Sequence, residues 1–162
     1  MNRSEQWVIL LRHGIAEARG SIPDEERALT GKGRRRMRRS ARALTRLIPA
    51  VDAIASSPLR RCIQTAHLVA ERSRVSEVEL LDELQPQAEP EGFLRYLRET
   101  ESSTIVCVGH EPLLSRIACA LLGIENNSGL ELRKGGCYVF TICSGVSHLE
   151  WMLAPRVLRS VR

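Results

Sequence analysis

The segment "WVILLRHG", residues 7–14, defines the first element of the fold. Five consecutive apolar residues are typical of a β-strand that is covered on both faces, because a strand with one wet face alternates apolar and polar side chains. The run ends abruptly in Arg12, His13 and Gly14. A buried strand has no need of these polar side chains, so they are either its solvated end or part of a functional site.

The rest of the chain alternates helix and strand patterns. Thr30 is a good N-cap for a helix over 29–48, and Pro49 follows the end of that helix. The final segments "GCYVFTIC" (136–143) and "HLEWML" (148–153), joined by a small turn, predict a β-hairpin. The other expected strands are 7–11, 51–56, 78–81 and 104–109, and the other expected helices are 58–72, 90–99 and 111–123.

This β-α-β-α order predicts one α/β domain over residues 1–162. We expect a three-layer α/β/α sandwich with a mostly parallel central sheet and a C-terminal hairpin.

Composition is that of an ordinary globular protein, with 43% hydrophobic and 27% charged residues. No apolar stretch has membrane-spanning length, and the N-terminus lacks the pattern of a secretory signal, so we expect a cytoplasmic protein without a membrane partner. The five cysteines are scattered without a C-x-x-C pair, which argues against a disulfide framework and a structural zinc site.

The net charge of +5 comes mainly from arginine, and six arginines crowd into "RRRMRRSAR", residues 34–42. Met37, Ala41, Leu44 and Ile48 fall at helical spacing, so this segment is interpreted as an amphipathic helix with its arginines outside. Aromatic residues make up only 4% of the chain, which disfavours base stacking, and we expect no nucleic-acid binding. Recruitment of an acidic partner protein remains open.

Three of the predicted strands end in polar residues. The first ends in Arg12 and His13, the second is followed by Arg60 and Arg61, and the strand over 104–109 is followed by His110. Ligands of open α/β sheets bind outside the carboxyl ends of the strands. We therefore expect these side chains to meet at one edge of the sheet.

Two histidines with arginines beside them suit phosphoryl transfer without a metal or another cofactor. Arginine presents donors that match phosphate oxygens. An unprotonated histidine can attack phosphorus, and neighbouring arginines favour its neutral form. A second histidine, protonated, can then meet the charge that develops on the transferring group.

Five segments carry a resemblance to a known family. The tripeptide Arg12-His13-Gly14 resembles the RHG signature of the histidine phosphatase superfamily, which includes the phosphoglycerate mutases. Further segments in the same order resemble other parts of the family pattern: "ALTGKG" (28–33), "SSPLRRCIQTA" (56–66), "VCVGHEP" (106–112) and "ELRKGGCYVF" (131–140). The resemblance covers nearly the whole chain and implies a phosphoglycerate mutase-like fold.

The resemblance also implies roles for individual residues. His13 would be the nucleophile, Arg12 a phosphate ligand, and His110 the second histidine of the site. The family arginine falls on Arg61, which leaves Arg60 at the rim or on the surface. Cys62 replaces a usual alanine.

A proton donor is harder to place. Glu83 lies about where mutase-like members carry a glutamate, and Asp82 and Glu111 compete with it. A carboxylic acid is needed for a poor leaving group, whereas a phosphorylated imidazole needs less help. Glu17 and Arg27 are expected in loops that border the pocket.

Short segments at 14–29 and 81–93 make the chain similar to the compact SixA-type phosphohistidine phosphatases of bacteria. This likeness implies a phosphohistidine phosphatase acting on a phosphorylated protein. The alternatives are a phosphomonoesterase for a small phosphorylated substrate and a non-catalytic member that binds a phosphate or a phosphoprotein.

Overall fold

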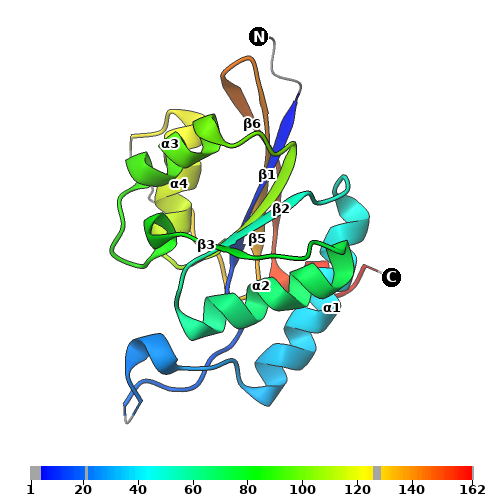
Figure 1. The fold of residues 1–162 in the computed structure, drawn as a ribbon, viewed down its shortest axis with the longest axis vertical. Coiled ribbons are helices and arrows are strands. Elements are labelled where there is room, and N and C mark those ends of the chain that lie inside the picture. Colours follow the sequence, from blue (N-terminus) through cyan, green and yellow to red (C-terminus); the bar gives the residue numbers. More distant parts are fainter. Residues whose placement is uncertain (1–4, 21, 126–128, 162) are drawn as a thin grey trace.

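A computed structural model describes residues 5–20, 22–125 and 129–161. Within them the protein forms a six-stranded sheet with helices on both faces (Figure 1). The strands are β1 (Gln6–Arg12), β2 (Ala53–Ser56), β3 (Glu79–Leu80), β4 (Thr104–Gly109), β5 (Cys137–Cys143) and β6 (Val146–Leu153). The helices are η1 (Asp24–Glu26), α1 (Gly31–Leu47), α2 (Arg60–Ser73), η2 (Asp82–Leu84), α3 (Pro90–Glu99), α4 (Leu113–Leu122) and α5 (Pro155–Leu158).

The strand order is β3-β2-β4-β1-β5-β6. The first four strands in this order run parallel, while β5 pairs with β1, and β6 with β5, in antiparallel fashion. The predicted α/β class, the mostly parallel sheet and the C-terminal hairpin are therefore confirmed. The parallel strands β2, β4 and β1 are neighbours, so their carboxyl ends share one edge of the sheet.

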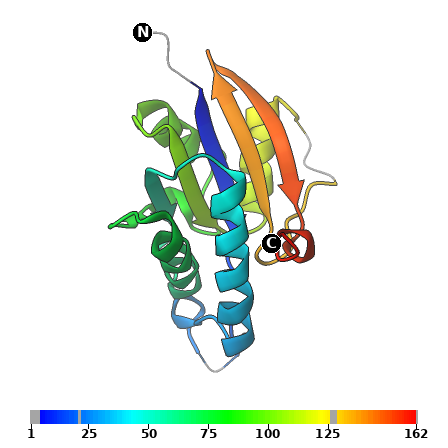
Figure 2. The ribbon, with the colours of Figure 1, turned by 90° about the vertical axis from the view of Figure 1, so that its right-hand side faces the viewer.

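Side chains of β1 alternate between the two helical layers. Ile9 and Leu11 belong to the cluster packed under α1 and α2, and Val8 and Leu10 belong to the cluster under α3 and α4. Figure 2 shows α1 on one side of the sheet. Burial on both faces explains why β1 is continuously apolar, since either face of the strand lies in a core.

Helix α1 begins close to the loop that follows β1. The Thr30 hydroxyl caps the helix by accepting from Gly33 N at 3.0 Å, and Thr30 N donates to Ile15 O at 2.9 Å. Gly33 passes so close to this loop that a Cβ added there would lie 2.1 Å from Ile15 O. Glycine is therefore required at this crossing.

Most predicted elements differ from the observed ones by at most two residues at each end. The single-turn helices η1, η2 and α5 were absent from the prediction, because one turn is too short to produce a periodic pattern. None of the helices in the described part of the chain has the length and hydropathy needed to cross a membrane.

Candidate active site

The ends of three neighbouring strands form the floor of the site. Arg12, the last residue of β1, pairs with Gly109 at the end of β4, and His13 N donates to Gly109 O at 3.1 Å. On the other side of β4, Ser57 N donates to Val108 O at 2.9 Å. This register places the residues that follow β1, β4 and β2 beside one another.

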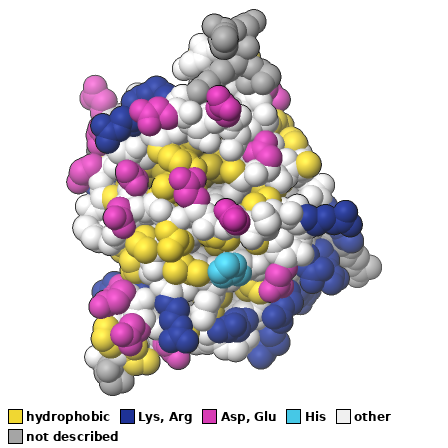
Figure 3. Space-filling view, viewed as in Figure 1, with side chains coloured by type: hydrophobic (Ala, Val, Ile, Leu, Met, Phe, Trp, Pro, Cys, Tyr) yellow, Lys and Arg dark blue, Asp and Glu magenta, His cyan; other side chains and the backbone are white. Residues whose placement is uncertain are grey.

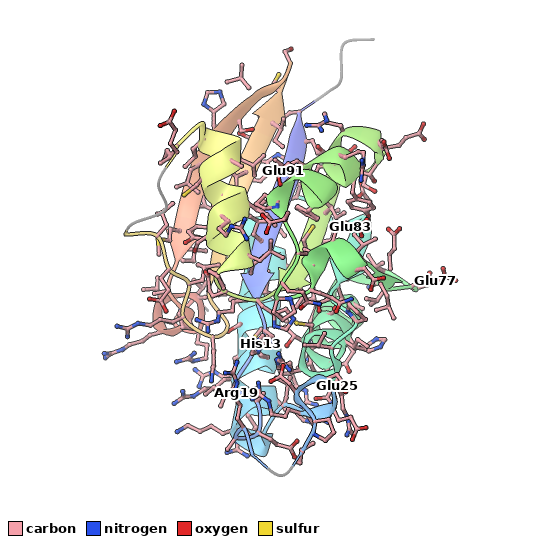
Figure 4. The ribbon with its side chains drawn as sticks, turned by 90° about the vertical axis from the view of Figure 1, so that its left-hand side faces the viewer. His13, Arg19, Glu25, Glu77, Glu83 and Glu91 are labelled. Atoms are coloured by element: carbon pink, nitrogen blue, oxygen red, sulfur yellow. The ribbon has the colours of Figure 1, made fainter. Side chains whose placement is uncertain are left out.

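Arg61, in the first turn of α2, connects the two histidines. Its side chain is only 3% exposed. Its Nε donates to His13 Nε2 at 3.3 Å, and its Nη2 lies 3.4 Å from His110 Nδ1. The centroids of the two imidazole rings are 5.1 Å apart. Figure 4 shows His13 below the end of β1. The structure thus brings Arg12, His13, Arg61 and His110 together.

Hydrogen bonds assign the tautomer of each histidine. His13 Nδ1 lies 2.7 Å from Gly14 O, an acceptor, so Nδ1 carries the hydrogen and Nε2 keeps its lone pair. Arg61 Nη2 can only donate, so His110 Nδ1 accepts from it, and His110 Nε2 then carries the hydrogen that faces the Ser57 hydroxyl at 2.9 Å. Two unprotonated nitrogens therefore converge on one guanidinium.

The pKa values of both histidines are lowered, which favours the neutral imidazole at pH 7. Burial is the main cause that lowers the pKa of His13 to about 3; the hydrogen bond to the Gly14 carbonyl opposes it, and the charges of Arg61 and Arg12 lower the pKa further. The pKa of His110 is also lowered to about 3, by burial first and then by His13 and Arg61. The expected protonated form of His110 therefore requires a bound anion to favour it.

Arg12 is held from the far side of the site. Its Nη1 donates to Leu132 O, and Nη1 also lies 4.0 Å from the exposed carboxylate of Glu131. Its buried Nε has no hydrogen-bond partner among the described residues. This guanidinium keeps an unused donor, as is expected of an arginine that binds an anion.

Asp24, in η1, is a member of the site that the sequence analysis missed. Its Oδ2 accepts from Arg61 Nη2 at 2.9 Å, its backbone carbonyl accepts from Arg61 Nη1 at 2.6 Å, and its Oδ1 accepts from Arg27. Burial raises the pKa of Asp24, but the hydrogen bonds and the charges of Arg27 and Arg61 together outweigh burial and lower that pKa to about 2. Asp24 follows no predicted strand, so its position in the sequence does not indicate that it lies at the site.

The expected proton donors are not free in the site. Glu83 does not border the cavity that contains His13, because its Cγ lies against Gly92 at the start of α3, and Figure 4 shows it away from His13. Asp82 is exposed and accepts from Gln85. Glu111 borders the cavity, but its carboxylate accepts from Ser115 and from Leu132 N. The structure therefore does not bring Glu83 together with His13, since η2 directs its side chain toward α3.

The cavity has a volume of about 350 Å³. Glu17 and Arg27 border it, as expected, while Arg60 is exposed outside it. Among the described residues, no three His, Cys, Asp or Glu side chains gather closely enough to hold a metal ion. The lining comprises Arg12, His13, Ala16, Glu17, Ala18, Arg19, Asp24, Arg27, Arg61, Pro86, His110, Glu111 and Lys134.

Cys62 lies beneath His110, with Sγ 3.3 Å from His110 Nε2. Burial raises the pKa of this thiol, so it stays protonated at neutral pH. Cys62 is therefore a small, neutral side chain packed against His110.

Comparison with known proteins places this geometry in a family. The model for the histidine phosphatase superfamily (branch 1) matches residues 8–88. An uncharacterized protein of Picosynechococcus sp. is 31% identical over 143 residues, which cover 86% of each chain.

Solved structures share the fold over almost the whole chain. A protein histidine phosphatase SixA complexed with tungstate superposes with a TM-score of 0.82 at 24% identity, covering 93% of this chain and 98% of that one. A protein of Agrobacterium tumefaciens assigned as a phosphohistidine phosphatase SixA gives a TM-score of 0.77 at 27% identity, with the same coverage. A phosphoserine phosphatase of Entamoeba histolytica gives 0.78 at 20% identity, covering 94% and 99%. One architecture is therefore shared by proteins with different substrates.

Proposed function

Because the chain belongs to the histidine phosphatase superfamily, we propose that it is a phosphatase that works through a covalent phosphohistidine at His13. The observation that carries this proposal is the convergence of His13 Nε2 and His110 Nδ1 on the buried Arg61. A neutral nucleophile beside fixed positive charge is what attack on a phosphoryl group requires.

We propose further that the substrate is a phosphohistidine side chain of another protein. Hydrolysis of a phosphomonoester releases an alkoxide, which needs a proton from a nearby acid. The carboxylates that border the cavity are poorly placed to supply one. Asp24 is ionised between two arginines, Glu17 accepts from Ala28 N, and Glu111 accepts from Leu132 N.

A phosphohistidine substrate avoids this need. When the substrate ring carries a proton on its other nitrogen, the His13 Nε2–P bond forms as the substrate N–P bond breaks, and the bonding pair leaves on a neutral imidazole. His13 keeps its Nδ1–H on Gly14 O throughout. Water then attacks phosphorus, the Nε2–P bond breaks, and both protons of the water leave with dihydrogen phosphate. No step requires a protonated carboxyl group.

The solved structures with this fold support the proposed phosphatase activity, and those of SixA proteins support the phosphohistidine substrate. One SixA protein binds tungstate, an oxyanion of phosphate-like shape, in a structure with the same fold. The phosphoserine phosphatase shows that this fold also serves a monoester, so a small-molecule phosphomonoesterase is the alternative. A cytoplasmic location, as expected from the sequence, remains part of the proposal.

Hydrolysis of an activated aryl phosphate in the presence of EDTA tests the chemistry. We expect wild-type turnover, loss of turnover in His13→Ala, and wild-type turnover in a matched control, His67→Ala, because His67 is exposed on α2. Acid-labile, alkali-stable phosphate should accumulate on the wild type during turnover. Unchanged activity of His13→Ala would rule out the nucleophile, and vanadate binding without turnover would indicate a non-catalytic member.

Substrate class requires a second comparison. We expect turnover of phosphohistidine peptides and activated aryl phosphates, whose leaving groups need no acid, and little turnover of serine phosphate or sugar phosphates. Efficient hydrolysis of an alkyl phosphate would favour the phosphomonoesterase.

A further inference from the structure

We propose that an arginine-rich surface beside the active site is a docking surface for an acidic segment of the phosphoprotein substrate. This surface, here called the basic face, consists of Arg36, Arg39, Arg42, Arg133, Arg156 and Arg159. The proposal extends the proposed function, because it rests on the substrate being a protein.

The basic face is continuous with the active site. A second cavity, of about 400 Å³, is lined by Arg36, Arg133, Arg156 and Arg159, and it shares Arg12 and Lys134 with the cavity that holds His13. A third hollow, lined by Arg39, Arg42 and Arg46, shares Arg159 with the second. One bound chain could therefore pass from His13 along α1 without leaving positively charged surface.

The packing of α5 against α1 brings the arginines of the basic face together. The two helices contact each other and lie side by side in Figure 2. Leu158 is buried in the same core cluster as Met37, which fixes α5 and directs Arg156 and Arg159 toward the arginines of α1. Along α1, Arg36 to Arg46 spans about 15 Å.

Among the residues that the structure describes, no acidic side chain neutralises the charges of the basic face. The sequence contains no aspartate or glutamate over 28–51, 132–149 or 151–162. In the described parts of the chain, none of the six arginines forms an ion pair. Lys and Arg side chains accordingly gather over α1 and the C-terminal segment in Figure 3.

Mutual repulsion makes such a cluster unfavourable unless an anion is bound there. Arg39 Nη2 donates to Arg159 O at 3.4 Å, and the pKa of Arg159 is lowered by burial and then by Arg36 and Arg39. Like charges held this close raise the local potential and attract an anionic partner.

An acidic polypeptide fits this surface better than a nucleic acid. No aromatic side chain lines either of the two basic hollows, so bases have nothing on which to stack. Trp7 and Trp151 instead contact each other, with ring centroids 6.0 Å apart, and Trp7 lies near the start of β1, the end opposite His13. A partner that also presents a phosphorylated side chain to His13 is a protein.

Two synthetic peptides test the docking. Each carries one phosphohistidine and a six-residue tail, either glutamates or glutamines, which extends to about 20 Å. For the wild type we expect kcat/KM about tenfold higher with the glutamate tail at low salt, and a smaller advantage at high salt. The variant Arg39→Glu/Arg42→Glu should lose the advantage while its activity on aryl phosphate is unchanged.

Arg72→Glu/Arg95→Glu is the matched control, because it changes the net charge equally at exposed positions on α2 and α3. It should keep the preference for glutamate. Equal kcat/KM for the two tails on the wild type, or equal loss of the preference in both variants, would overturn the proposal.

A binding measurement separates this proposal from the proposed function. A fluorescent glutamate-tailed peptide without the phosphoryl group should bind the wild type at least about fivefold more tightly than Arg39→Glu/Arg42→Glu. If neither phosphopeptide is hydrolysed but this difference is seen, the substrate assignment fails and the docking surface stands. Equal affinities, or tighter binding of a DNA strand of equal charge, would refute an acidic polypeptide as the occupant.

Discussion

Replacing the two active-site histidines by glutamine should remove most of the acid sensitivity that they give to the folded protein. The folded-state pKa of each, about 3, lies below the ordinary value of 6.5. Below pH 6.5 the unfolded chain therefore binds protons that the folded protein excludes. The stabilising contribution is complete above pH 6.5 and is lost progressively as the pH falls toward 3.

The size of the effect follows from proton linkage. One pH unit below the unfolded pKa, each excluded proton costs about 1.4 kcal/mol. Between pH 7.5 and pH 5.5 the wild type should lose about 3 kcal/mol through His13 and His110 together. The His13→Gln/His110→Gln variant should lack this loss, whatever its stability at pH 7.5.

Urea denaturation followed by circular dichroism at the two pH values measures the difference. The buffer must be free of phosphate and other oxyanions, because a bound anion stabilises the folded state. His67→Gln is the control, since it removes an exposed histidine and should keep the wild-type pH dependence. If wild type and double variant lose the same free energy of unfolding, the two histidines are not held neutral by burial.

Three further substitutions test the geometry of the site and of its support. Arg61→Lys should lower kcat/KM for an aryl phosphate about 100-fold, because one ammonium cannot replace a fork that contacts both histidines; wild-type circular dichroism would exclude misfolding. Gly33→Ala should lower the free energy of unfolding by about 3 kcal/mol in urea denaturation, because its Cβ would lie 2.1 Å from Ile15 O. Gly31→Ala, whose Cβ would meet only a side chain at 3.7 Å, should change stability little. Asp24→Asn should lower the inhibition constant of vanadate about fivefold, because it removes a negative charge that competes with vanadate for Arg61. This change corresponds to only about 1 kcal/mol, since the Asp24 side chain is 44% exposed. Weaker inhibition of the variant would show that Asp24 instead positions the arginine.

The site residues at the strand ends could be predicted from the sequence, because neighbouring parallel strands have their carboxyl ends at the same edge of the sheet. The apolar run 7–11 and the run 104–109 are adjacent in the sheet, so His13 and His110 meet as a consequence of backbone pairing. The position of Arg61 follows in the same way, because it lies in the first turn of the helix after β2. None of these placements depends on the conformation of a long loop.

Glu83 and Asp24 show the limit of that logic. Sequence position favoured Glu83, but η2 turns its side chain toward Gly92. Asp24 reaches the site because η1 folds back across it and because Arg27 and Arg61 bind its oxygens. A single-turn helix has no periodic signal, and the direction of its side chains depends on contacts with distant residues.

The α/β class, the order of the elements and the polar residues at the strand ends can be predicted from the sequence, because hydrophobic periodicity and strand polarity are local properties. The packing of the folded chain determines which carboxylate faces Arg61, that both histidines are buried with lowered pKa values, and that α5 contributes to the basic face. Each of these depends on burial or on contacts between residues far apart in the chain. The segment "WVILLRHG" shows both effects. Its apolar half forms strand β1 because of its sequence pattern, and the tertiary packing around its end lowers the pKa of His13.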